Sequence, residues 1–89
     1  MNTIDFCKIC DDLGMERYDN HCDVNEFITF RTKMGLDYLI TASHFKSRAL
    51  VVYSVIYDTV VEQKECFTKL QLSSVIRNFI NKGKMATGK

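Results

Sequence analysis

The chain has no proline, and therefore no proline-rich linker that would mark a domain boundary. Its 89 residues suffice for one small domain, so we expect a compact unit over residues 1–83 and a frayed basic tail over residues 84–89. The start of the chain lacks the basic segment and apolar run of a secretory signal. The longest apolar stretch, residues 49–57, is interrupted by Ser54 and is too short to cross a bilayer. These absences predict an intracellular, cytoplasmic protein that does not bind membranes.

Motifs for phosphate binding and catalysis are also missing. No glycine-rich phosphate loop occurs, and the polar segment 19–26 lacks the central glycine and the late glutamate of a calcium loop. His44 has Ser43 and Ser47 nearby, but nothing in this spacing indicates that a nucleophile, a base and an orienting acid converge in one pocket. The sequence therefore predicts a protein that is not an enzyme.

Charge is distributed unevenly along the chain, although the net charge is only +1. Residues 1–44 carry four basic and eight acidic side chains, whereas residues 45–89 carry eight basic and three acidic ones. Such asymmetry can mark an interaction surface. In the alternative interpretation, the two halves lie side by side and neutralise each other.

The four cysteines are the residues that point most directly to specific chemistry. In an intracellular protein they are expected as thiols or metal ligands rather than disulfides. Cys7 and Cys10 have the Cys-x2-Cys spacing of zinc sites, and Cys22 follows directly after a histidine. A complete site would need His44 or Cys66 to fold back onto this pair. The predicted zinc ligands are Cys7, Cys10, Cys22 and His44.

A helical interpretation of the same segment competes with zinc binding. Cys10 belongs to an apolar stripe with i, i+3, i+4, i+7 spacing, which predicts an amphipathic helix that is capped by Asn2 or Thr3 and ends at Gly14. The stripe consists of Phe6, Ile9, Cys10 and Leu13. A cysteine in such a stripe behaves as a small hydrophobic residue. We therefore expect no cofactor, with zinc as the alternative.

The middle of the chain is rich in aromatic and β-branched residues, which favour strands. We expect strands over residues 27–32, 36–42, 49–57 and 60–67, with a turn at residues 33–35. The third of these has apolar residues on both faces and should lie centrally in its sheet. Two alternatives remain. A capping box at residues 23–26 would start a helix over 24–34, and residues 47–67 could form one long helix in an all-α domain.

The C-terminal segment has the pattern of an amphipathic helix that is capped by Thr68 or Ser73 and ends at Gly83. Its apolar face contains Leu72, Val75, Ile76, Phe79 and Ile80. Together these elements predict an α+β fold. An N-terminal helix and a C-terminal amphipathic helix would accompany an antiparallel sheet of three to four strands.

Two kinds of partner are compatible with this domain. A basic surface with an aromatic residue could bind RNA or DNA, and its residues would be Phe45, Lys46, Arg48, Arg77, Lys82 and Lys84. A sequence pI near 7.7 argues against a dedicated nucleic-acid binder. We therefore expect protein–protein contact by a non-enzymatic inhibitor or adaptor, acting as a homodimer or on another protein. Some virus-encoded domains that disable host factors are as small as this chain, and the analogy with them rests on size alone.

Overall fold

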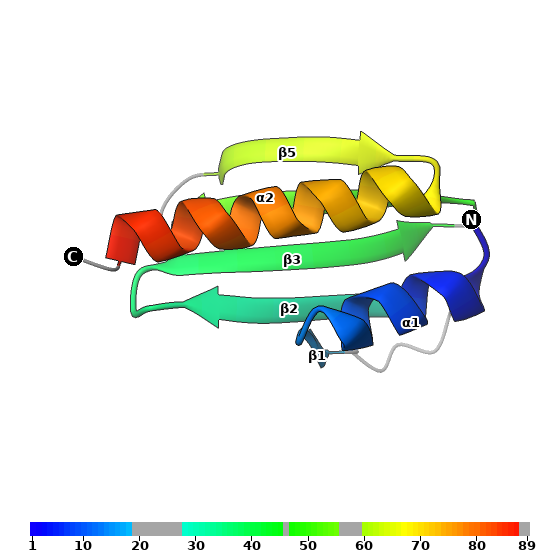
Figure 1. Ribbon diagram of the computed structural model, residues 1–89, viewed down its shortest axis with the longest axis horizontal. Helices are drawn as coiled ribbons and strands as arrows, with labels where there is room; N and C mark the ends of the chain where they lie inside the picture. Colours follow the sequence, from blue (N-terminus) through cyan, green and yellow to red (C-terminus); the bar gives the residue numbers. More distant parts are fainter. Residues whose placement is uncertain (19–27, 46, 56–59, 88–89) are drawn as a thin grey trace.

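The computed structural model describes residues 1–18, 28–45, 47–55 and 60–87. In this part of the chain, two helices lie on one face of a five-stranded antiparallel sheet (Figure 1). The elements are α1 (Thr3–Asp12), β1 (Glu16–Arg17), β2 (Ile28–Met34), β3 (Tyr38–Phe45), β4 (Arg48–Val55), β5 (Val60–Cys66) and α2 (Lys69–Thr87). The predicted α+β fold is confirmed, with one strand more than expected.

The strands follow one another across the sheet in the order in which they occur in the chain. Phe30 of β2 pairs with Ala42 of β3, which pairs with Val51 of β4, and Val51 pairs with Lys64 of β5. β4 lies between β3 and β5, as its apolar character predicted. The alternative of a helix over residues 47–67 is wrong, because residues 48–55 and 60–66 form β4 and β5, and the valine and tyrosine side chains of β4 pack on a pleated surface.

The other helical alternative, residues 24–34, is also wrong for its described part, since residues 28–34 form β2. Residues 24–27 lie outside the described residues. The predicted turn at residues 33–35 is displaced toward the C-terminus: β2 continues through Met34, and Gly35 begins the turn with a positive φ of 70°. Glycine adopts this left-handed conformation without the steric cost that a Cβ would bring.

The predicted N-terminal helix is confirmed. The Asn2 side chain accepts a hydrogen bond from the backbone N–H of Asp5 at 2.8 Å, so Asn2 rather than Thr3 is the cap. Phe6 and Cys10 are fully buried. Beyond the helix, Gly14 has a positive φ of 83° and reverses the chain toward β1.

β1 lies outside the strands that the sequence predicts. It is only two residues long, and Glu16 pairs with Arg31 of β2. The backbone N–H of Tyr18 donates to the Thr29 oxygen at 2.7 Å, and the Arg31 guanidinium carbon lies 4.1 Å from the centre of the Tyr18 ring. These contacts to β2, rather than any apolar pattern of its own, form this strand.

Helix α2 begins at the predicted cap, Thr68, but does not end at Gly83. It continues to Thr87, so residues 84–87 of the predicted frayed tail are helical, whereas residues 88–89 lie outside the described part. Gly83 is buried against Met34, whose side chain occupies the space that a Cβ at Gly83 would need. The glycine therefore allows close packing of the helix on β2 instead of ending the helix.

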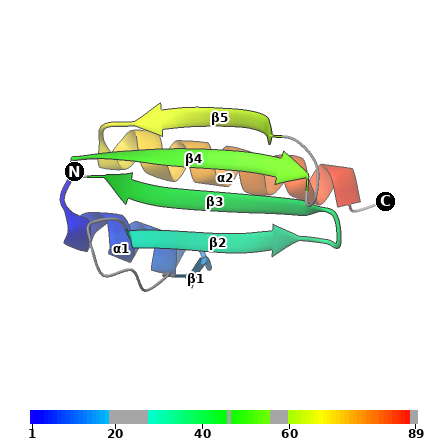
Figure 2. The ribbon, with the colours of Figure 1, turned by 180° about the vertical axis from the view of Figure 1, so that it is seen from behind.

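The core lies between the helices and the sheet. It contains Phe6 and Cys10 from α1, and Leu72, Ile76 and Phe79 from α2; the sheet contributes Phe30, Ile40, Ala42, Ala49, Val51, Tyr53 and Cys66. Figure 2 shows the opposite face of the sheet, which neither helix covers. Neither helix is long and apolar enough to cross a membrane, within the residues that the structure describes.

Candidate functional site

The predicted zinc ligands have very different surroundings. Cys10 is fully buried in the core, and Cys7 is half-buried on the same helix. His44 is only 3% exposed; its ring stacks on Phe6 with 5.0 Å between centroids, and its Nε2 donates a hydrogen bond to the backbone oxygen of Met1 at 3.2 Å. His44 thus connects β3 to the N-terminus.

Within the described residues, no three His, Cys, Asp or Glu side chains lie together as metal ligands would. Cys22, together with the whole polar segment 19–26, lies outside this part of the chain. The zinc interpretation therefore stays a prediction.

Two of the cysteines are poor candidates for reactive or ligating thiolates. Burial, supported by the nearby Cys7 and Asp11, raises the pKa of the Cys10 thiol from 9.0 to about 12. Burial also raises the pKa of the Cys66 thiol, although the nearby Lys64 opposes this shift. Both side chains are fully buried, so at neutral pH they are protonated, apolar parts of the core.

The residues predicted to bind nucleic acid do not form one surface. Phe45 and Arg48 lie at the hairpin between β3 and β4, whereas Lys82 and Lys84 lie in the last turns of α2, at the opposite end of the molecule (Figure 1). Arg77 is exposed in the middle of α2. Lys46 lies outside the described residues.

Two of these basic residues form ion pairs within the molecule. Arg48 donates to the Glu65 carboxylate at 2.6 Å, and Lys82 pairs with Glu62. Both pairs connect β5 to a neighbouring element: Arg48 belongs to β4, and Lys82 belongs to α2. Their positive charges are therefore partly compensated by the carboxylates of β5.

The outer edge of β5 is a feature that the sequence analysis did not identify. β5 pairs with β4 along one side, from Ser54↔Val60 to Ala49↔Cys66. No strand of the described residues pairs with its other side. Its outward backbone N–H and C=O groups are therefore open to a further strand.

Apolar side chains are exposed at both ends of this edge. Val60 and Val61, at the start of β5, are each 53% exposed. Phe67, which follows the strand, is also 53% exposed, and Leu70 in the first turn of α2 is 78% exposed. The edge thus combines open backbone groups with apolar contact area.

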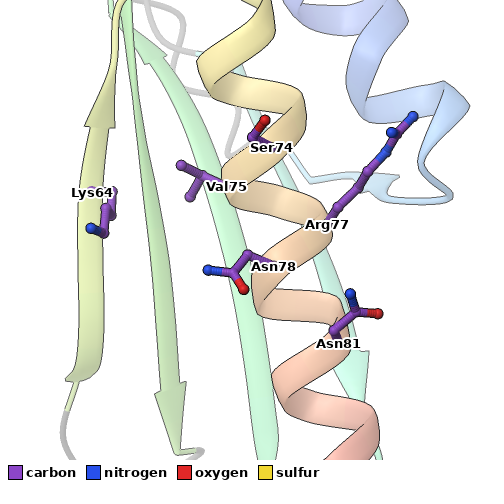
Figure 3. A pocket seen from close by; sticks show the side chains of 6 residues that line it. All are labelled: Lys64, Ser74, Val75, Arg77, Asn78 and Asn81. Atoms are coloured by element: carbon purple, nitrogen blue, oxygen red, sulfur yellow. The ribbon is translucent and has the colours of Figure 1, made fainter.

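A shallow open groove of about 500 Å³ lies between β5 and α2. It is lined by Lys64, Ser74, Val75, Arg77, Asn78 and Asn81. Figure 3 shows Val75 and Asn78 pointing toward β5, whereas Arg77 points away from it, toward α1. The groove therefore offers amide and hydroxyl groups beside the edge, with Lys64 as its charged residue on the strand.

Comparison of the chain with family models, with curated protein sequences and with solved structures finds no match.

Proposed function

We propose that this protein is a small non-enzymatic binding module, of the inhibitor or adaptor type, that acts by protein–protein contact through the outer edge of β5. The observation that carries this proposal is the seven-residue β5 strand, paired on one side only within the described residues. An extended segment of a partner that adds to such an edge gains main-chain hydrogen bonds. The exposed Val60, Val61 and Phe67 would contribute apolar burial to the same contact.

The charges on β5 are compatible with selective binding. Natural proteins often place lysine on edge strands, because a charged side chain discourages indiscriminate pairing. β5 carries Glu62, Lys64 and Glu65 between its apolar ends. A partner strand with opposite charges at the facing positions would be favoured, and one with like charges would be rejected.

Site-specific photo-cross-linking in the cells of the protein's source tests this proposal. A photoreactive residue at Gln63, on the β5 edge, should cross-link to a defined polypeptide that mass spectrometry identifies. The matched control is the same residue at Lys33, which is exposed on β2. The purified partner should then bind the wild-type chain and lose affinity for Val61→Lys. The proposal fails if position 63 yields no product beyond that of position 33, or if Val61→Lys binds the partner as tightly as the wild type.

A further inference from the structure

We propose that the strand added to this edge is β5 of a second copy, paired antiparallel about a twofold axis that passes through Gln63. This inference rests on the proposed binding role of the edge and specifies its occupant. The evidence is the sequence of β5 itself, Val60-Val61-Glu62-Gln63-Lys64-Glu65-Cys66, together with the position of α2.

Symmetry restricts the registers in which two copies of β5 can pair. Paired residues of antiparallel strands have their side chains on the same face of the sheet, whereas neighbours along one strand face opposite sides. In a dimer with a twofold axis normal to the sheet, one residue of the strand must therefore pair with the same residue of the second copy. An axis at Glu62 places two carboxylates opposite each other, and an axis at Lys64 does the same with two ammonium groups. Like charges directly opposite each other are destabilising. An axis nearer either end of the strand leaves several of its residues unpaired.

The register centred on Gln63 avoids this repulsion and overlaps the two strands from Val60 to Cys66, with the irregularity of the β4–β5 register lying at Val61. Glu62 then lies opposite Lys64 of the second copy, and by symmetry Lys64 lies opposite Glu62 of that copy. The two glutamine side chains face each other on the axis. The isolated β5 strand is therefore complementary in charge to itself in this one register.

The same register brings the exposed apolar ends of the edge together. In this register the start of β5, where the pairing with β4 is irregular at Val61, lies beside the end of the partner's β5. Val60 and Val61 therefore lie at the same end of the joined sheet as the partner's Phe67. Each of these three residues is 53% exposed in the single chain. The twofold axis creates this contact twice, once at each end of the paired strands, and so adds apolar burial to the backbone hydrogen bonds.

The helices leave room for the two sheets to join. α2 lies over β4, one strand in from the edge (Figure 2). Two copies of α2 would thus be three strand spacings apart, about 14 Å. Packed helices approach to about 8–10 Å, so the two α2 helices would not collide. The two grooves at Lys64 and Asn78 would lie side by side across the axis.

A charge-swap experiment tests the register. The full chain should be dimeric by native mass spectrometry and by light scattering across a dilution series. Glu62→Lys and Lys64→Glu each replace both attractive pairs by repulsive ones, and each should raise the dimer dissociation constant by about tenfold or more. An equimolar mixture of the two variants restores both attractive pairs and should form a heterodimer. Lys33→Glu on β2, the matched control, should dimerise like the wild type.

A second pair of variants covers the case in which a charge swap disturbs the fold, since Glu62 also pairs with Lys82. Gln63→Lys and Gln63→Glu each place like charges on the axis, and their mixture should again form a heterodimer. Circular dichroism verifies folding of every variant. A monomeric wild type, variants that dimerise like the wild type, or a mixture that stays monomeric would each overturn the proposal. A monomer that still cross-links through Gln63 to a different protein would overturn self-pairing and leave the binding role of the edge intact.

Discussion

At the scale of single residues, Gly83 is the position where we expect the effect of alanine on the free energy of unfolding to be opposite to that predicted by helix propensity. A Cβ at Gly83 would lie 2.6 Å from Met34 Cγ and 2.8 Å from Met34 Cβ. Alanine normally stabilises a helix by about 1 kcal/mol relative to glycine. Here we expect Gly83→Ala to lower the free energy of unfolding by about 1–3 kcal/mol, because α2 must move away from β2. Urea unfolding measures this, with the exposed Ser74→Ala as control. A gain in stability for Gly83→Ala would contradict the packing described.

Cys10 should make the free energy of unfolding fall at alkaline pH. The unfolded thiol ionises near its ordinary pKa of 9.0, whereas burial raises the folded pKa to about 12. Below pH 9 both states are protonated and Cys10 contributes no pH dependence. As pH rises above 9 toward 12, the unfolded state loses the proton first, so the free energy of unfolding falls. Guanidinium unfolding from neutral pH to about pH 10 measures this slope. Cys10→Ala should reduce the slope, and Cys7→Ala should retain most of it, because burial is the main cause of the raised Cys10 pKa; an unchanged slope in Cys10→Ala would assign the effect to other groups.

At the scale of the elements, the start of α2 depends on a reciprocal cap. The Thr68 hydroxyl accepts from the Gln71 N–H at 3.1 Å, and Gln71 Oε1 accepts from the N–H groups of Thr68 and Phe67 at 3.2 and 2.8 Å. We expect Thr68→Ala to cost about 1 kcal/mol of unfolding free energy and Thr68→Ser to cost little. Thermal unfolding compares the two. Equal losses for both would show that the hydroxyl is not the stabilising group.

The elements that the sequence predicts well are those whose apolar pattern decides their structure. The stripe around Phe6 and the Val-rich segment of β4 each identify their element, because one face or both must be buried. β1 has no such pattern and forms through its contacts with β2. The end of α2 was misplaced because Gly83 serves a tertiary contact with Met34. In these two cases long-range packing overrides the local signal.

The candidate site was harder to predict than the fold. Residues 60–67 were expected to form a strand, but which strand lies at an edge depends on the order of strands in the sheet. The opposite charges of Glu62 and Lys64, on either side of Gln63, are visible in the sequence. They indicate a possible pairing register only once the open side of β5 is known. Conversely, the sequence grouped Arg48 with Lys82, although the fold places them at opposite ends.

At the scale of the whole molecule, the uneven charge is partly compensated within the fold. The acidic N-terminal segment and the basic C-terminal helix lie on the same face of the sheet (Figure 1). Lys69 at the start of α2 lies 3.9 Å from the Asp5 carboxylate of α1. This contact joins the acidic half to the basic half, whereas the Arg48–Glu65 and Lys82–Glu62 pairs lie within the basic half. An exposed pair at this distance contributes little to stability, so this contact alone does not hold α1 and α2 together.

The strand order has a consequence for how the chain reaches its native state. From β2 to β5, each strand pairs with the strand that precedes it in the chain, so these pairings close short segments and cost little loop entropy. α1 is different, since His44, Ser47 and Lys69 hold the N-terminal residues from far along the chain. We therefore expect the hairpins to form early and α1 to dock late. Until α1 docks, Phe30 and His44 lack the cover of the Phe6 ring, so the partly folded sheet exposes apolar surface to which a second chain can aggregate.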